Sequence, residues 1–351
     1  MSVCEQSLEL TMRVMRSGRP IAAEQPLAFD PAFGAEHLVI ERDGAVVSSV
    51  VTLLRTLVVG EQEVQVGLIG SVVTDEAHRG QGLATELLAR AEAQLKQSGA
   101  VLALLWADER EFYAARGYVP IGTELDYSVP RALAEYLPPT DRVRMAGPAD
   151  WPVLHALYEG HPERVQRSLE ETGALLAGPD VHALVFDGPQ GIDGYAIEGR
   201  GEDLGGIVHE WGGRAESVLT CLGAHLDRLP EGQESLWWMV PPSQVELQGL
   251  MNEAGVEGVL GVLGMGKLLD AECLARWMQA ITPESVDVQP ERDGLRVTGP
   301  GGNIFLDAVH SLFAVVPPQA NRELIEVVES AVGAELPQLP QHVFLWGLDS
   351  I

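Results

Sequence analysis

Apolar and polar positions in the first third of the chain follow the spacing of strands and helices in turn. Residues 37–59 form two apolar runs around Asp43-Gly44, a dipeptide that favours the tight turn of a β-hairpin. Residues 64–73 predict another strand, and apolar residues recur at helical spacing over 83–95. The continuous apolar run over 100–106 predicts a buried strand. This succession indicates a mixed α/β fold.

Two further parts follow with similar patterns. Pro130 and the proline-rich stretch Leu137–Thr140 indicate a boundary. After it, the element order of the first part recurs weakly, so we predict three domains, over residues 1–135, 141–266 and 267–351. We expect helices at 109–116, 150–159, 165–176, 215–229, 270–280 and 320–332, and strands at 118–121, 124–129, 181–186, 194–198, 204–209, 235–240, 285–289, 295–298 and 303–307.

Composition excludes several classes of protein. No apolar run of about 18 residues is present, so we expect no membrane span. The N-terminal segment lacks a continuous apolar core, which argues against a secretory signal. Cys4, Cys221 and Cys273 lie far apart in the sequence and form no CxxC pair. We interpret them as free thiols of a cytoplasmic protein, and we expect no metal site.

The net charge narrows the range of ligands. The chain carries 51 acidic and 23 basic residues, which gives a formal charge of −28. Such a surface repels phosphate backbones, so nucleic acid is excluded as a partner. The charge favours a cationic small molecule, and a surface tuned for solubility is the alternative. The apolar last ten residues, HVFLWGLDSI, are unusual for a terminal segment and predict that they dock against the protein.

One turn in the first domain carries candidate chemistry. It joins the strand over 64–73 to the helix over 83–95 and reads Arg79-Gly80-Gln81-Gly82-Leu83-Ala84. Glycines let the backbone approach a ligand, and a helix start offers free N–H groups and the positive end of its dipole. With the cation of Arg79, this pattern favours a diphosphate cradle, and a structural turn without a ligand is the alternative.

A second motif follows the buried strand and reads Glu111-Phe112-Tyr113-Ala114-Ala115-Arg116-Gly117-Tyr118. The chain resembles the GNAT superfamily of acyl-coenzyme A transferases in two motifs, RxxGxA and FYxxxGY. It also resembles them in the order of elements around these motifs: strand, turn, helix, strand and helix. The resemblance implies acetyl-coenzyme A as cosubstrate. It also implies an amine of a small molecule or of a lysine side chain as the acetyl acceptor.

Three shorter stretches resemble the enhanced-intracellular-survival (Eis) type of acetyltransferase: 77–79, 105–109 and 263–270. That family has two GNAT units in tandem and then a domain similar to sterol carrier proteins. The resemblance implies a GNAT fold with a mixed central sheet, a second degenerate GNAT-like domain and a small α+β sterol-carrier-like domain. No second RxxGxA occurs in 141–265, so we expect the second unit to bind no coenzyme. The family suggests a homo-oligomer, and Glu76 replaces its usual proline.

The resemblance also implies roles for single residues. In GNAT enzymes the exposed backbone of a splayed strand binds the pantetheine arm, and Val72, Val73 and Thr74 match that edge. An N–H group near Val73 would polarise the thioester carbonyl. Tyr113 matches the general acid, since a phenol with a pKa of about 10 can protonate a departing thiolate. Packing of Tyr113 on the coenzyme is the alternative. The C-terminal carboxyl group of Ile351 is the candidate base, with a water chain to an acidic side chain as the alternative.

Other motifs support competing hypotheses. Gly261–Lys267 fits GxxxxGK, but Leu268 stands where a nucleotide-binding P-loop needs Ser or Thr, so we interpret it as a glycine-rich turn between strands. His209-Glu210-Trp211 fits either an acceptor pocket or ordinary strand-end residues. A non-catalytic, regulatory acyl-coenzyme A-binding protein is the alternative to an enzyme, and Tyr113 argues against it.

Overall fold

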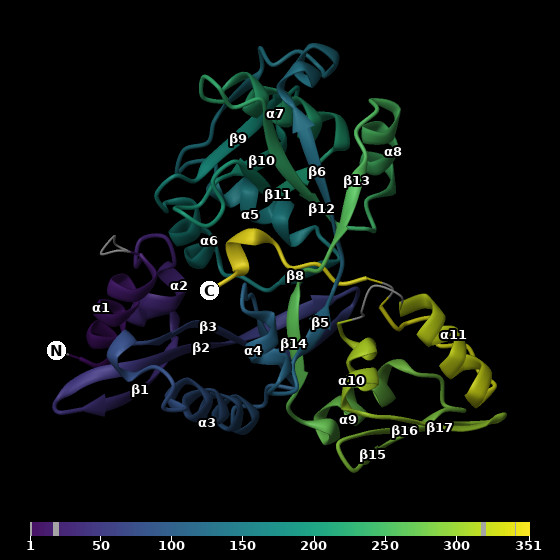
Figure 1. Cartoon of the computed structure of the whole chain (residues 1–351). Coiled ribbons are helices and arrows are strands. Elements are labelled where there is room, and N and C mark those ends of the chain that lie inside the picture. Colours follow the sequence, from purple (N-terminus) through teal and green to yellow (C-terminus); the bar gives the residue numbers. More distant parts are fainter. Residues whose placement is uncertain (1, 17–20, 317–320, 341) are drawn as a thin grey trace.

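The structure, a computed structural model, describes residues 2–16, 21–316, 321–340 and 342–351. Its strands form two large sheets and one small sheet, and helices pack on them (Figure 1). In Figure 1 the second sheet lies above the first, and the small sheet lies beside the first. Parallel and antiparallel pairs occur in both large sheets, which confirms the predicted mixed α/β class.

The first sheet contains the predicted hairpin and has the order β1-β2-β3-β4-β14-β5, with β8 paired to β2. Its strands are β1 (Glu36–Arg42), β2 (Ala45–Val59), β3 (Gln62–Thr74), β4 (Leu102–Leu105), β5 (Val119–Ile121), β8 (Glu163–Val165) and β14 (Gly264–Leu268). Asp43 and Gly44 both have positive φ, as the tight turn between β1 and β2 requires. The hairpin prediction is therefore confirmed.

Helices cover both faces of this sheet. The predicted helix, α3 (Leu83–Gln97), packs on Val47, whereas α1 (Val3–Met15) packs Leu10 on the neighbouring Val46. Successive residues of a strand point to opposite faces, so α1 and α3 lie on opposite sides of the sheet. Helix α1 was not predicted from the sequence, although Ser2 and Glu5 form a capping box at its start. Two short helices complete this part: α2 (Pro26–Phe29) and α4 (Arg110–Ala114).

The second sheet has the order β13-β6-β12-β11-β10-β9-β7. Its strands are β6 (Glu124–Pro130), β7 (Val143–Met145), β9 (His182–Gly188), β10 (Gly191–Glu198), β11 (Ile207–Gly213), β12 (Ser235–Val240) and β13 (Gly258–Gly261). The helices near it are α5 (Trp151–Glu159), α6 (Leu169–Leu176), α7 (Ala215–Asp227) and α8 (Val245–Glu253). The helix expected over 165–176 begins only at Leu169, because Ser168 caps it and β8 precedes it.

The remaining part is a small α+β unit. An antiparallel sheet of β15 (Asp287–Glu291), β16 (Gly294–Gly299) and β17 (Gly302–Leu306) packs against α9 (Ala271–Ile281), α10 (Ala308–Ser311) and α11 (Asn321–Val332). The three strands, α9 and α11 correspond to expected elements, although β15 begins two residues later than expected and Ala320 of the expected last helix lies outside the described residues. The short helix α10 was not expected. The likeness of this unit to sterol carrier proteins stays a prediction.

The two large sheets exchange strands. β6 pairs with β12 and β13 in the second sheet, and β14 lies between β4 and β5 in the first. Figure 1 shows the chain running from β13 down into β14 across the junction. The division into three domains by residue range stays a prediction. The sheets do not follow it strictly, because β6 precedes residue 135 yet joins the second sheet, and β14 begins before residue 266 yet joins the first. Gly264–Leu268 is strand, so the glycine-rich turn expected over 261–267 is wrong beyond Leu263.

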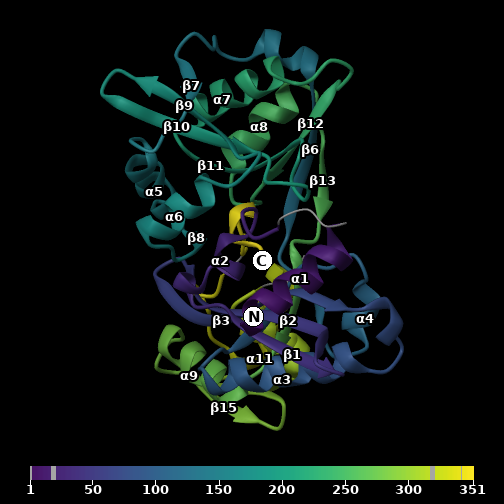
Figure 2. The same ribbon diagram turned by 90° about the vertical axis from the view of Figure 1, so that its left-hand side faces the viewer.

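The last residues fill the space between the two large sheets. Val343, Phe344, Leu345, Trp346 and Leu348 are buried and belong to the same apolar cluster as the sheets. Figures 1 and 2 show this yellow segment between the first and second sheets. The prediction that the apolar tail docks against the protein is therefore confirmed. Short 3-10 helices lie at Pro31–Phe33, Glu76–His78, Arg131–Tyr136, Leu312–Ala314 and Gly347–Asp349.

Within the described ranges, none of the helices is both long enough and apolar enough to cross a membrane.

Candidate active site

The middle of the first sheet opens where β3 and β4 separate. Their parallel pairing runs from Val66 to Leu68 of β3 and stops there, while β3 continues to Thr74. A bulge occurs opposite Val50 of β2, and Ser71 within it has a φ of 46°. Bulges bend a strand and increase its twist. Among the residues that the structure describes, the segment from Gly70 to Thr74 thus has no strand partner on the β4 side.

The predicted diphosphate turn lies at the end of this segment. Gly80 and Gly82 have φ values of 75° and 77°, in the left-handed region that favours glycine. Gly82 is the N-cap of α3 and no side chain caps the helix, so its first N–H groups face outward. Arg79 donates a hydrogen bond from Nε to the carbonyl oxygen of Thr74, 3.3 Å away. This bond holds the guanidinium beside the start of α3.

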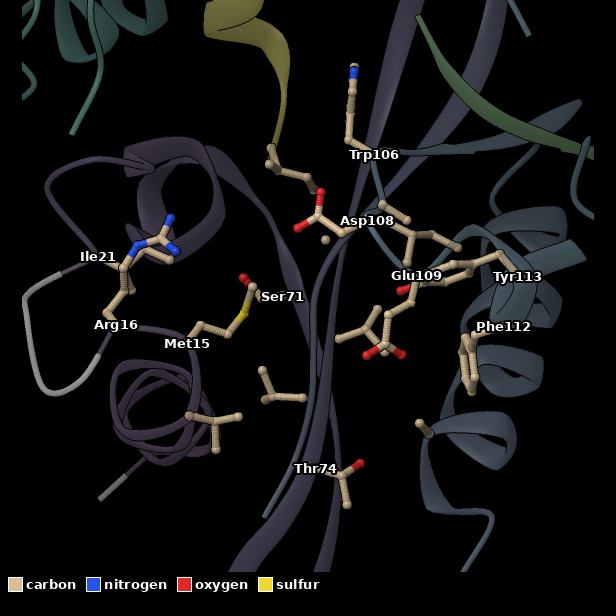
Figure 3. A pocket seen from close by; sticks show the side chains of 18 of the residues that line it. Met15, Arg16, Ile21, Ser71, Thr74, Trp106, Asp108, Glu109, Phe112 and Tyr113 are labelled. Atoms are coloured by element: carbon tan, nitrogen blue, oxygen red, sulfur yellow. The ribbon is translucent and has the colours of Figure 1, made fainter. Parts of the chain in front are cut away.

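Tyr113 lies on α4 and points its hydroxyl toward the opening beside β3 (Figure 3). Its ring packs edge-to-face on Phe112, with centroids 5.0 Å apart, and on Tyr118, with centroids 5.9 Å apart. Burial, and in second place the negative charge of Glu109, raise the pKa of Tyr113 to about 12. The phenol therefore keeps its proton throughout the neutral and mildly alkaline range.

Ile351 reaches the same opening from the other side. A Cβ atom built on Gly70 would overlap the carbonyl carbon and oxygen of Ile351. The tail thus lies directly over the backbone of β3, one residue before the bulge at Ser71. The carbonyl group of Ser350 is bound by the buried Arg200, whose Nη1 lies 2.9 Å from it.

One cavity of about 1110 Å³ collects these features. Figure 3 shows Met15, Arg16 and Ile21 on one side of it, Phe112 and Tyr113 on the other, and β3 between them. The predicted site residues that line it are Val72, Val73, Thr74, Arg79, Gly80, Gly82, Leu83, Ala84, Tyr113 and Ile351. Gln81 is exposed and does not line the cavity. His209, Glu210 and Trp211 lie in the buried part of β11 and do not line the cavity.

Several residues that line the cavity were not predicted from the sequence. Arg116 stacks on the ring of Phe112 and donates hydrogen bonds to Thr85 in the first turn of α3. This arginine is a second cation at the diphosphate turn, and its place in the FYxxxGY motif could have suggested it. Arg16, at the end of the unpredicted α1, reaches the cavity from the opposite side. No local pattern signals that contact, because it depends on how the N-terminal segment folds over the sheet.

Charges are divided between the two ends of the cavity. Arg79 and Arg116 lie at the start of α3, whereas Asp108 and Glu109 follow β4. The loop after β10 adds Glu202 and Asp203, which pair with Arg16. One end is therefore suited to an anion. The other end is rich in carboxylates, with one arginine among them.

Comparison with known proteins decides the class of the first unit. Residues 5–121 match the family model described as an acetyltransferase (GNAT) domain. The chain contains a GNAT acetyltransferase domain. By this domain it is an N-acetyltransferase by class. Most residues that line the cavity described above lie in the GNAT domain, and later parts of the chain add Arg200, Glu202, Asp203, Leu204, Ser350 and Ile351. No curated protein matches the chain.

Solved structures resemble the whole chain and not only the GNAT domain. A GCN5-related N-acetyltransferase from Anabaena variabilis is 15% identical with a TM-score of 0.70, and the match covers 99% of this chain and 97% of that one. One from Kribbella flavida is 15% identical with a TM-score of 0.64, covering 100% and 98%. Eis1 from Mycobacterium abscessus is 18% identical with a TM-score of 0.58, covering 86% and 82%. At these identities the likeness shows the fold.

No group of three or more His, Cys, Asp or Glu residues that could hold a metal ion occurs in the part of the chain that the structure describes.

Proposed function

We propose that the GNAT domain transfers the acetyl group of acetyl-coenzyme A to an amine of a cationic acceptor, either a small molecule or a lysine side chain. One observation carries this proposal. The same cavity is lined by the proton donor Tyr113, by the carbonyl group of Ile351 and by the open edge of β3. An acyl transfer to an amine needs these three elements: a donor for the leaving group, a proton acceptor and a site that orients the thioester.

The diphosphate end fits the coenzyme. The left-handed Gly80 and Gly82 leave open space at the start of α3, where a Cβ atom would meet nothing. Outward N–H groups of Leu83 and Ala84 and the helix dipole attract phosphate oxygens. Arg79 and Arg116 add two cations at this end of an otherwise acidic protein. Gln81 would contribute through its backbone only, since its side chain is outside the cavity.

The edge of β3 would orient the pantetheine arm. Backbone groups of Val72, Val73 and Thr74 lie beyond the last pair of β3 with β4 and can bind an extended arm as a strand would. We assign the N–H group of Val73 as the donor that polarises the thioester carbonyl. Such a donor stabilises the negative charge that develops on the carbonyl oxygen during attack.

The proton balance assigns the two remaining groups. The acceptor ammonium must lose a proton before its nitrogen attacks the carbonyl carbon, and we propose the C-terminal carboxyl group of Ile351 as the base. The new carbon–nitrogen bond forms as the carbon–sulfur bond breaks, and Tyr113 donates its proton to the sulfur. The second proton that the attacking nitrogen loses as the amide forms restores Tyr113 through water, and the carboxyl group of Ile351 releases the first proton to solvent. The net products are an amide, the free thiol and one proton.

The carboxylate-rich end would select the acceptor. Asp108, Glu109, Glu202 and Asp203 line this end, and Arg16 offsets part of their charge. A cation gains from this field, most of all when a second positive group can reach the acidic loop after β10. We therefore propose acceptors with two or more amines. The homo-oligomer that the family suggests stays a prediction.

The test is release of free thiol from acetyl-coenzyme A with polyamines, aminoglycosides, lysine peptides and matched monoamines. We expect release with multiply charged amines and a KM that rises with salt, because exposed charges are screened. Equal thiol release with a diamine and a monoamine of the same length would contradict the proposal that the carboxylate-rich end selects the acceptor. Tight coenzyme binding without release with any amine would support the non-catalytic alternative.

A blocked tail tests the base separately. Adding Gly-Ser after Ile351 converts its carboxyl group into an amide while it leaves the preceding contacts in place. We expect kcat to fall by about 10²-fold or more, the usual contribution of a general base. An unchanged kcat would assign the proton to another acceptor.

A further inference from the structure

A buried cluster of charges holds the tail two residues before Ile351. Arg167 donates from Nε to Asp349, 2.7 Å away, and from Nη2 to Glu210, 2.8 Å away. The three side chains are between 0% and 3% exposed. The hydroxyl of Tyr158 donates to the other carboxylate oxygen of Asp349 at 2.8 Å, and its ring lies under the Arg167 guanidinium. Asp349 is therefore bound at both oxygens.

Arg200 holds the same segment through its backbone. Its Nη1 donates to the carbonyl oxygens of Gly347, Leu348 and Ser350 at 3.2, 3.3 and 2.9 Å. Its Nη2 donates to the hydroxyl of Ser350 at 2.9 Å. The side chain is 2% exposed, and burial lowers its pKa to about 10, which leaves it charged at neutral pH. One guanidinium thus closes a turn of the tail.

Close packing fixes the tail on either side of this turn. The ring of Trp346 stacks on His161, with centroids 4.1 Å apart, and its Nε1 donates to the carbonyl oxygen of Glu163. A Cβ atom on Gly347 would overlap the imidazole of His209. Gly70 leaves room for Ile351 at the other end. The tail is therefore closely packed on both sides of the turn.

The side chains outside the tail that donate hydrogen bonds to Asp349 and to the carbonyl groups beside it all come from residues 141–266, the range predicted as the second unit. Tyr158 lies on α5, Arg167 follows β8, Arg200 follows β10 and Glu210 lies on β11. Ile351, however, lies over β3 of the GNAT domain. The unit without a diphosphate motif thus supports a residue in the site of the unit that has one.

We propose that Arg167, Glu210, Tyr158 and Arg200 form a tail latch, a set of positioning residues that holds Asp349 and so places the carboxyl group of Ile351 in the acetyl-transfer site. The positioning role rests on the proposed function, because it gives Ile351 a part in catalysis. It assigns a task to the second unit, and it explains three buried residues, His209, Glu210 and Trp211, that do not reach the cavity.

The buried charges of the tail latch fix how far along the groove the tail lies. Leu345, Trp346 and Leu348 alone would bind the groove by apolar contact, which is not directional, and the tail could shift along it by a residue. A shift would leave the Asp349 carboxylate buried without partners and leave Arg167 with Glu210 alone, which is far more costly than losing apolar contact. Buried ion pairs contribute little net stability but can specify one arrangement. A displacement of about 1 Å in a reacting group can lower a rate by about 10²-fold.

Asp349→Asn tests the latch because it keeps the shape of the side chain and removes its charge. We expect carboxypeptidase Y to release Ile351 at least about tenfold faster than from the parent chain, measured by mass spectrometry. We also expect kcat to fall by about 10- to 100-fold, with little change in the KM of acetyl-coenzyme A. Arg200→Lys keeps a charge but loses the planar fork, so it should release the tail to an intermediate extent.

The matched control is Glu171→Gln. Glu171 pairs with Arg55 between α6 and β2, so this variant also weakens an ion pair between the two units, but it does not touch the tail. We expect its tail to stay protected and its kcat to stay within a few-fold of the parent. Equal release of the tail from Glu171→Gln and Asp349→Asn overturns the latch.

The two proposals can fail separately. A parent chain that transfers no acetyl group overturns the proposed function, and the digestion rates alone then decide whether the latch holds the tail. An Asp349→Asn chain with parental digestion and parental kcat overturns the latch. Faster digestion with an unchanged kcat overturns its positioning role.

Discussion

No side chain fits between the Cα atom of Gly70 and the carbonyl group of Ile351. The first lies on β3 of the GNAT domain, and the second belongs to a tail held by the second unit. The φ of Gly70 lies outside the left-handed region, so backbone conformation does not require glycine there. The close approach of the Ile351 carbonyl group does. The contact joins residues 281 positions apart in the sequence, and it brings the tail to the edge of the strand that would bind the thioester.

Gly70→Ala should displace the Ile351 carboxyl group. We expect kcat to fall by about 10- to 100-fold, because the added methyl group overlaps the tail while the diphosphate turn stays intact. Steady-state kinetics and calorimetric binding of the coenzyme measure the two effects. In a chain that lacks Ile351, the same substitution should have little further effect, because residues that act through one contact are not additive. Full additivity would show that Gly70 acts otherwise.

Tyr113→Phe should remove the proton donor and leave coenzyme affinity nearly unchanged. General acids contribute about 10²- to 10⁴-fold to a rate, so a loss of this size in kcat is expected. The matched control is Tyr118→Phe. It removes the hydroxyl from the ring that packs edge-to-face on Tyr113, and Tyr118 does not line the cavity. Equal losses in both variants would indicate that Tyr113 serves only in packing.

The raised pKa of Tyr113 predicts the alkaline limb of the rate profile. The acid form is the active donor, and it persists until the pH approaches its pKa of about 12. The ordinary phenol value is about 10. We therefore expect kcat to show no decline with a midpoint near pH 10 in assays run to the limit of protein stability. A decline with that midpoint in the parent, absent in Tyr113→Phe, would contradict the assigned environment.

Arg79→Glu should weaken coenzyme binding. The substitution reverses the charge beside the start of α3, and we expect the Kd of acetyl-coenzyme A to rise by more than about tenfold at low salt. Arg90→Glu is the matched control, because Arg90 lies further along the same helix, pairs with Glu86 and does not line the cavity. Calorimetry that finds the same Kd for both variants and the parent would remove the diphosphate assignment.

The sequence predicted the parts of the site that depend on local pattern. Asp43-Gly44 identified the hairpin, the glycines before Leu83 identified the start of α3, and α4 began within one residue of the expected helix. These features rest on turn geometry and periodicity, which neighbouring residues determine. The cavity accordingly is lined by all the residues assigned from the sequence to the coenzyme and to proton transfer except Gln81. His209, Glu210 and Trp211, named as a possible acceptor pocket, also lie outside it.

Features that depend on distant pairing could not be predicted. Gly264–Leu268 is rich in glycine and suggested a turn, yet it pairs with β4 and β5 because the small residues Gly264 and Gly266 let it pass close to neighbouring backbone and side chains. Arg16 and Arg167 reach their partners across 187 and 182 residues. No local period signals such contacts, and the tail latch was therefore absent from the sequence prediction.

Because β14 follows the second sheet in the sequence but belongs to the first sheet, the order in which the two sheets are completed during synthesis is fixed. β4 and β5 are joined through β14, so the first sheet lacks an inner strand until residue 268 has left the ribosome. By then the whole of the second sheet has emerged. The catalytic unit is thus completed after the unit that supports it, and a fragment of residues 1–135 would present unpaired strand edges and aggregate.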